Sequence, residues 1–237
     1  MSDSTEKPDY NPGLIHYKYG NGDGKSTSAF GMVIRALGHG FKPIIIQFLK
    51  KSIDRPGSNG LLENLHKLDF NVDDLIDKYL IPTSGDSENI AQSSVGDQSH
   101  GISQKGFDYG EYRTFNKVLE IPIIQLGTPN FVFSHQKPTD FELRRYKLGT
   151  ALIKRLFSSD TADLVVLDEI NTAIALNLIE KTAFIRILEN KKEQIEVVMT
   201  GREEIPELID MADYVTEFKE KKHPFQKKIY ARKGAEY

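Results

Sequence analysis

A glycine-rich segment followed by a lysine and a serine is the strongest chemical signal in the sequence. Glycines allow the backbone to turn its N–H groups inward around a phosphate. A helix that begins at such a turn adds the partial positive charge of its N-terminus. Lys25 can reach phosphate oxygens, and the Ser26 hydroxyl can ligate Mg²⁺. The candidate phosphate ligands are Gly20, Asn21, Gly22, Asp23, Gly24, Lys25, Ser26 and Thr27.

The spacing of this segment is one residue shorter than the common phosphate-loop pattern. That pattern, G-x-x-x-x-G-K-[ST], would place a glycine at position 19, where the chain has Tyr19. The segment could therefore be a chance glycine-rich turn. Its context favours a phosphate loop, because an apolar strand pattern precedes it and an amphipathic helix pattern follows it.

A second signal is the apolar run LVVLDE at 164–169, which ends in two carboxylates. Carboxylates at strand ends are common caps of the following helix. Paired with a phosphate loop, however, the run resembles a Walker B element, which supports Mg²⁺ opposite the phosphates. Asp168 and Glu169 are therefore candidate metal ligands together with Ser26, and the spacing leaves open which carboxylate touches the metal.

Thr200-Gly201-Arg202 follows a third apolar run. Residues just past the carboxyl ends of parallel strands line the ligand crevice of such sheets. Arg202 is therefore a candidate partner for a phosphate or a carboxylate. The alternative is a turn with a solvated arginine, and the sequence alone leaves both open.

The elements that must position these residues alternate between apolar strand patterns and helical patterns. Strand, glycine-rich turn, helix and strand form a βαβ unit, so the sheet is expected to be mostly parallel. We predict one doubly wound α/β domain over 1–237, of the P-loop NTPase, RecA-like type, with helices on both faces. The expected strands are 14–19, 43–49, 121–126, 164–167, 195–200 and 214–218, and the expected helices are 25–37, 140–157, 173–188 and 203–211.

The alternation stops between residues 51 and 108, which we interpret as an insertion. Residues 61–80 are expected to form one or two short helices. Residues 83–108 are rich in serine and glycine and contain few large apolar residues, so we predict a mobile loop there. Its role is left open between a surface insertion without function and a lid that orders over bound substrate.

Composition narrows the class of protein. The chain has 237 residues, a net charge of -3 and no cysteine. The charge gives no electrostatic case for a nucleic acid or an anionic membrane as partner. No apolar run is long enough to span a bilayer, and the polar start has no secretory pattern, so we expect a cytoplasmic location. The lack of cysteine excludes disulfides and thiolate metal sites.

Several segments, taken in order, resemble the P-loop-type corrinoid adenosyltransferases (ATP:cob(I)alamin or cob(I)yrinic acid a,c-diamide adenosyltransferases). The short phosphate loop is a trait of that family. The resemblance covers most of the chain outside 51–108. The matching pieces are GNGDGKSTSAFG, RALGHG, IIIQFLK, LVVLDE, TGR, KHPF and ARKGAEY.

The resemblance implies an activity and a set of ligands. Members transfer the 5′-deoxyadenosyl group of ATP to the cobalt of a reduced corrinoid and release triphosphate, in cobalamin biosynthesis or salvage. It implies ATP as co-substrate, Mg²⁺, a corrinoid acceptor, an electron donor such as a flavoprotein, and a homodimer. Residues 20–27 would hold the triphosphate, with Arg35 and Arg202 as further candidates. Lys25 and Arg202 would act in catalysis, and Ser26 and Glu169 would ligate Mg²⁺ beside Asp168.

The resemblance also places an aromatic segment near the corrinoid. Here that segment is 127–133, with Phe131 and Phe133 as candidates. The alternative is ordinary core packing of the two rings. The chain departs from the family at Asp23, where many members carry a lysine, and at Phe133, where some have tryptophan. We assign no catalytic role to His223.

Two other functions remain open at this stage. One is a different P-loop enzyme, an ATPase or a kinase, which would release ADP instead of triphosphate. The other is a sensor that binds a nucleotide or corrinoid without turnover. The corrinoid-carrier motif D-x-H-x-x-G is absent from the sequence, which argues against a stable carrier.

Overall fold

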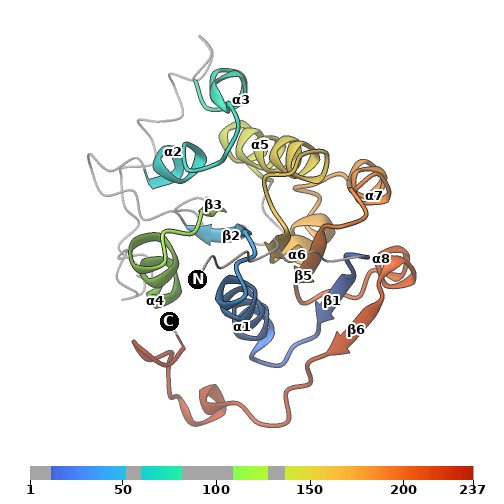
Figure 1. Cartoon of the computed structure of the whole chain (residues 1–237). Coiled ribbons are helices and arrows are strands. Elements are labelled where there is room, and N and C mark those ends of the chain that lie inside the picture. Colours follow the sequence, from blue (N-terminus) through green and yellow to red (C-terminus); the bar gives the residue numbers. More distant parts are fainter. Residues whose placement is uncertain (1–11, 52–59, 82–108, 128–136, 237) are drawn as a thin grey trace, which may run out of the picture.

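The fold is a six-stranded parallel sheet flanked by helices (Figure 1). The computed structural model describes residues 12–51, 60–81, 109–127 and 137–236. In this part of the chain the strand order is β3-β2-β4-β5-β1-β6, and all neighbouring strands are parallel. The strands are β1 (Ile15–Tyr19), β2 (Pro43–Lys51), β3 (Ile123–Gly127), β4 (Leu164–Asp168), β5 (Glu196–Thr200) and β6 (Tyr214–Glu217). This confirms the predicted doubly wound α/β sheet.

The strands form where the sequence offers short apolar runs. Every residue of β3, β4 and β5 is buried. Strands covered by helices on both faces read as continuous apolar segments, which is why the sequence alone located them. By contrast, β6 is exposed along its whole length at the edge of the sheet.

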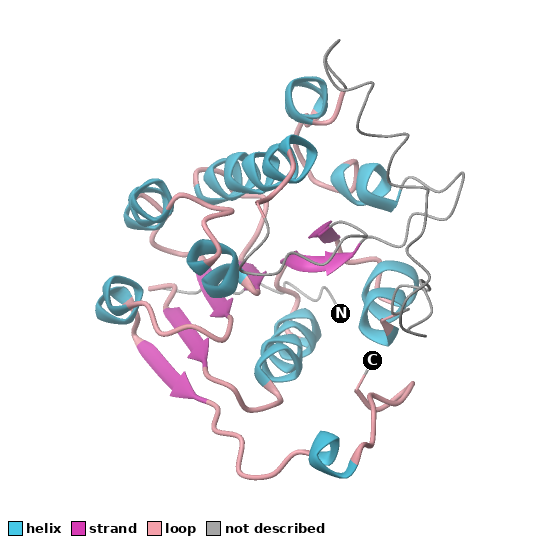
Figure 2. Ribbon diagram, turned by 180° about the vertical axis from the view of Figure 1, so that it is seen from behind, coloured by secondary structure: helices cyan, strands magenta, loops and turns pink. Residues whose placement is uncertain are grey.

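Helices cover both faces of the sheet (Figure 2). On one face α1 (Lys25–Gly38) buries Phe30 and Val33 against Ile45 and Val166. On the other face α5 (Asp140–Phe157) buries Leu148 and its neighbours in a larger cluster. The hydroxyl of Thr139 accepts from the Glu142 N–H, and the Glu142 carboxylate accepts from the Thr139 N–H, so a capping box starts α5 where predicted.

The single helix predicted at 173–188 was wrong. The structure has two helices there, α6 (Ile170–Ala175) and α7 (Lys181–Glu189). Asn177 has a φ of 56°, in the left-handed region, shortly after α6 ends. The Glu180 carboxylate then accepts hydrogen bonds from the N–H groups of Thr182 and Ala183, which starts α7 afresh. The predicted helix at 203–211 is also shorter, because α8 (Pro206–Met211) begins at a proline.

Within the segment interpreted as an insertion, two short helices belong to the core. They are α2 (Gly60–Leu65) and α3 (Asp73–Tyr79), close to the expected 61–80. Leu61, Leu65 and Leu75 are buried in the same cluster as α5. The mobile loop predicted at 83–108 lies outside the described residues.

Three short elements were not predicted. A four-residue helix, α4 (Gly110–Arg113), continues directly into a π-helical turn, η2 (Thr114–Val118), just before β3. Figures 1 and 2 both show α4 beside α1, near the edge of the sheet where β3 and β2 lie. A short 3₁₀ helix, η3 (Pro224–Lys227), lies in the exposed C-terminal segment. None of the helices in the described ranges is long and apolar enough to cross a membrane.

Candidate active site

The glycine-rich segment forms a loop that links the end of β1 to the start of α1. Gly20 and Gly24 have φ values of 112° and 97°, which side chains rarely tolerate. The Gly20 N–H donates to the Arg202 carbonyl at 3.1 Å, and the Gly22 N–H donates to the Phe218 carbonyl at 2.8 Å. A Cβ on Gly20 would lie 2.4 Å from the Phe218 carbonyl oxygen. The expected strand–loop–helix arrangement is thus confirmed, and the close approach explains the glycine at position 20.

Two polar side chains of the loop bond to backbone close by. The exposed Asp23 carboxylate accepts a 2.7 Å hydrogen bond from the Gly24 N–H. The Asn21 side-chain oxygen accepts from the Glu220 N–H at 3.0 Å. The Asp23 carboxylate therefore occupies the N–H of Gly24, one of the amide donors of the loop.

Lys25 lies at the first position of α1, and its ammonium donates to the Gly22 carbonyl at 2.7 Å. Partial burial lowers the pKa of Lys25, while the charge of Glu169 acts in the opposite direction. The ammonium can exchange this carbonyl for a phosphate oxygen. Thr27 is exposed on the same first turn.

Asp168 is the electrostatic centre of the site and is fully buried. Its Oδ1 accepts from the hydroxyls of Ser26 at 2.6 Å and Thr200 at 2.8 Å. Its Oδ2 accepts from Gln47 Nε2 at 2.9 Å and lies 3.3 Å from Lys50 Nζ. Burial opposes ionisation, but Lys50 and the hydrogen bonds outweigh it, so the pKa of Asp168 is lowered. With both oxygens engaged, Asp168 anchors Ser26.

Glu169 is differently placed and offers a more open carboxylate. Its backbone is left-handed, with a φ of 63°, and its N–H donates to the Thr200 hydroxyl at 3.0 Å. Thr172 donates to Glu169 Oε2 at 2.7 Å. Burial raises the pKa of Glu169, and the neighbouring Asp168 charge raises it further. A bound cation would relieve this cost.

The donor set fits Mg²⁺ held jointly with a nucleotide. Mg²⁺ is usually bound by one or two carboxylates together with phosphates and water. Ser26 supplies a hydroxyl at the start of α1, and Glu169 supplies a carboxylate directly after β4. Among the described residues, no three His, Asp or Glu side chains form a ready-made metal cage.

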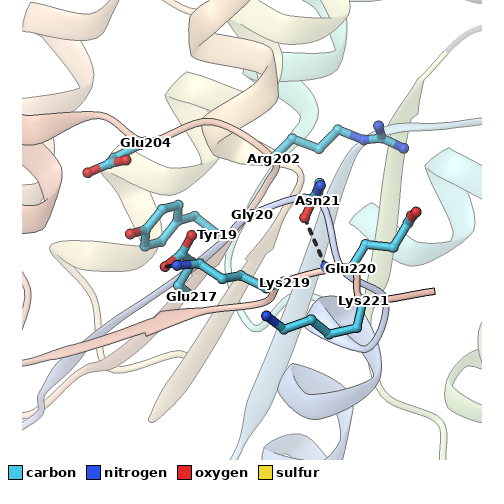
Figure 3. A pocket seen from close by; sticks show the side chains of 9 residues that line it. All are labelled: Tyr19, Gly20, Asn21, Arg202, Glu204, Glu217, Lys219, Glu220 and Lys221. Carbon is cyan, nitrogen blue, oxygen red and sulfur yellow. Dashed lines mark hydrogen bonds and ion pairs between the residues drawn. The ribbon is translucent and has the colours of Figure 1, made fainter. Parts of the chain in front are cut away.

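The structure brings Arg202 to the loop through its backbone. The Arg202 N–H donates to the Thr172 hydroxyl at 3.1 Å, and its carbonyl accepts from Gly20. Its side chain is exposed and lies near Asn21 (Figure 3). Both residues line an open pocket of mixed charge, with Tyr19, Gly20, Glu204, Glu217, Lys219, Glu220 and Lys221.

Other predicted site residues are not brought to the loop. Arg35 is exposed in the last turn of α1. It follows Lys25 by ten residues, which is about 15 Å along a helix axis. Within this chain Arg35 is therefore remote from the phosphate loop. Phe131 and Phe133 lie outside the described residues.

Three polar residues of the site were missed as candidates: Gln47, Lys50 and Thr200. Gln47 lies opposite Asp168 in the register of β2 with β4, and its side-chain oxygen accepts from Gln125 of β3 at 2.8 Å. The available signal was a glutamine inside an otherwise apolar strand, since a buried polar side chain requires a partner.

The strand order, the glycine-rich loop and the anchored Ser26 define a phosphate-loop protein of the doubly wound α/β class. The family model described as "ATP:corrinoid adenosyltransferase BtuR/CobO/CobP" matches residues 11–100 and 100–237. The chain belongs to this family, whose members are enzymes named for ATP and corrinoid substrates.

Curated relatives agree with the family match along nearly the whole chain. A corrinoid adenosyltransferase from Pseudomonas aeruginosa is 26% identical over 225 residues, covering 95% of this chain and 84% of the relative. One from Sinorhizobium is 27% identical over 226 residues, covering 95% and 80%. The corrinoid adenosyltransferase CobA of Salmonella typhimurium is 26% identical over 225 residues, covering 95% and 86%.

Proposed function

We propose that this chain transfers the 5′-deoxyadenosyl group of ATP to the cobalt of a reduced corrinoid and releases triphosphate. The electron pair of cobalt(I) forms a bond to the ribose C5′. The bond from C5′ to the α-phosphate oxygen breaks, and its electron pair leaves with the triphosphate. The family match and the phosphate loop at the crevice support this reaction.

The task of the protein in this reaction is to hold the leaving triphosphate and stabilise its charge. The amides at the start of α1 and the Lys25 ammonium face the negative charge that develops on the leaving group. Lys25 must first release the Gly22 carbonyl. Arg202, which lines the same pocket as Asn21, would add a second cation. No residue needs to activate water, because the attacking atom is cobalt.

We assign the Mg²⁺ ligands to Ser26 and Glu169, with Asp168 holding the Ser26 hydroxyl. When bound, Mg²⁺ supplies positive charge to the phosphates. The observation that carries this assignment is the 2.6 Å hydrogen bond from Ser26 to Asp168. It joins the loop to the carboxylate strand, and it leaves the Ser26 oxygen lone pairs available to a cation.

Further features of the proposal rest on the resemblance to the family. They are a homodimer, a cytoplasmic location, a flavoprotein-type electron donor, and Phe131 and Phe133 beside the corrinoid. In this placement, the two phenylalanine rings would favour loss of the lower axial ligand of the corrinoid, so that the cobalt can be reduced. Arg35 is remote from the phosphate loop of its own chain. Its proposed role in binding the triphosphate therefore requires a contact other than one within the same chain.

The test is an anaerobic assay with ATP, Mg²⁺ and chemically reduced cobalamin. The visible spectrum is followed for a light-sensitive cobalt–carbon bond, and the phosphate products are analysed. We expect adenosylcobalamin and triphosphate in equal amounts, both lost in Lys25→Ala. ADP and phosphate without alkylated corrinoid would show a P-loop enzyme of another kind. Bound ATP without any turnover would show a sensor.

A further inference from the structure

Lys50 reaches the site because β2 is irregular near its end. Ile46 and Phe48 face the cluster on the α5 side of the sheet. Strict alternation would place Lys50 on that side as well. Instead its ammonium lies 5.4 Å from the centre of the Phe30 ring, which belongs to α1 on the other face. The pairing of β2 with β3 shifts register between Gln47 and Lys51, and such irregularities redirect side chains.

The Lys50 ammonium lies between two carboxylates and two rings. It is 3.3 Å from Asp168 Oδ2 and 3.1 Å from Glu111 Oε1. It also lies 5.0 Å from the centre of the Tyr109 ring, and its side chain is only 17% exposed. Two negative charges exceed its single positive charge. Lys50 therefore has no surplus charge for a triphosphate. Lys25 differs, because its hydrogen bond described above is to a neutral carbonyl, that of Gly22.

The second carboxylate belongs to α4, whose Tyr112 hydroxyl accepts hydrogen bonds from Asn64 at 3.1 Å and from Asn116 at 3.3 Å. No residue of α4 is buried, and Glu111 lies in its first turn. Burial begins only at Phe115, in the π-helical turn that follows. Short π-helical segments are frequent at functional sites. The Lys50–Glu111 pair thus attaches the exposed start of this segment to the site.

We propose that Lys50 is a positioning residue that tethers α4 to Asp168, so that α4 forms the wall of the site on the side where the corrinoid enters. The phosphate loop leaves β1, while α4 lies at the end of the sheet formed by β2 and β3. A nucleotide held by the loop and the first turn of α1 leaves the part of the sheet edge at β2 and β3 to the second substrate. The identity of that substrate rests on the proposed function, but the tether does not.

The tether predicts that its loss affects the binding of the two substrates differently. Without Glu111, the loop, Ser26 and Asp168 remain in place, so ATP binding is retained. The wall loosens, so the corrinoid binds less well. Without Lys50, the buried Asp168 also loses its cation, so both substrates are affected.

The test combines hydrogen exchange with steady-state kinetics on Glu111→Ala. We expect the amides of 111–118 to exchange about tenfold faster, because local opening becomes easier. We expect KM for the corrinoid to rise about tenfold while KM for ATP stays within about twofold. Glu111→Gln keeps an acceptor for the ammonium and should restore much of both properties. Asp160→Ala, which breaks the exposed 2.7 Å pair with Lys192, should change neither.

Unchanged exchange over 111–118 in Glu111→Ala would overturn the tether. Equal rises of KM for ATP and for the corrinoid would overturn this expected difference between the two substrates. Lys50→Met should raise both KM values. Lys50→Arg should recover ATP binding more than corrinoid binding: the guanidinium restores a positive charge beside Asp168, but its planar shape differs from that of the lysine ammonium. If the wild type transfers no adenosyl group, the proposed function fails, and the exchange measurement still decides the tether.

Discussion

The Ser26 hydroxyl donates a 2.6 Å hydrogen bond to Oδ1 of Asp168, so the first turn of α1 is joined to the end of β4. The two residues are 142 positions apart in the chain. The same carboxylate oxygen accepts from Thr200 at the end of β5. The phosphate loop is therefore held against the sheet by contacts within the protein, which reduces the ordering cost of binding a nucleotide.

Lys25→Ala tests the role of the loop lysine. The ammonium faces the leaving triphosphate in the proposed reaction, so its loss should lower kcat by about 10²–10³-fold. Its contact with the Gly22 carbonyl is local, so the fold should survive. The check is the rate of adenosylcobalamin formation, with circular dichroism as control for folding. Near wild-type turnover in Lys25→Ala would remove it from the mechanism.

Asp23→Lys should strengthen nucleotide binding. Asp23 places a negative charge at the loop and accepts a hydrogen bond from the Gly24 N–H. The exchange releases the amide and reverses the charge, so ATP affinity should rise by about two- to tenfold at low salt. Isothermal titration calorimetry would measure it.

Asp23→Asn separates the two causes, because the asparagine oxygen can still accept from Gly24 while the charge is gone. A gain in both variants indicates charge, and a gain only in Asp23→Lys indicates the released amide or the added ammonium. Weaker ATP binding in Asp23→Lys would mean that the Asp23 carboxylate stabilises the loop conformation that binds ATP.

Much of the fold could be predicted because its signals are local. The strands β3, β4 and β5 contain short apolar runs that are buried along their length. The start of α5 is likewise a local feature, since Thr139 and Glu142 form a capping box within four residues. The break between α6 and α7 escaped because the apolar pattern continues across it, whereas the backbone at Asn177 and the cap at Glu180 decide it.

The candidate site was only partly predictable for a different reason. Ser26 and Asp168 belong to motifs with their own spacing. Lys50 acquires its place through a shift of strand register, which no spacing in the sequence reveals. Likewise, the ion pair of Asp168 with Lys50 and its hydrogen bond from Gln47 depend on the pairing of β2 with β4. This pairing decides that Glu169 is the more open carboxylate.

Gly20→Ala tests the close approach of the loop to the C-terminal segment. A methyl group there would lie 2.4 Å from the Phe218 carbonyl oxygen, on a backbone with a φ of 112°. The backbone strain should cost about 1–3 kcal/mol of unfolding free energy. Chemical denaturation would measure it. Gly31→Ala, which meets nothing within 4 Å on α1, is the control and should be neutral or stabilising. Equal stability of both variants would contradict the geometry.

Glu169→Gln should separate the stability of the protein from its metal-dependent function. Burial, and then the Asp168 charge, raise the pKa of Glu169 in the folded state. A raised pKa means that its contribution to stability is present below the unfolded pKa and is lost as pH rises through the folded pKa. The variant should thus be at least as stable as the wild type at neutral pH, and the difference should vanish as pH falls below about 4.3.

The same substitution removes a proposed Mg²⁺ ligand, so Mg²⁺-dependent ATP affinity should fall by about tenfold or more. Unfolding curves from pH 4 to 8 and ATP titrations with and without Mg²⁺ check the two halves. Thr172→Val provides a comparison, since it keeps the Glu169 carboxylate but removes both the hydrogen bond to Oε2 and the acceptor of the Arg202 N–H. A destabilised Glu169→Gln with full Mg²⁺ dependence would assign Glu169 to the structure and leave the cation to other ligands.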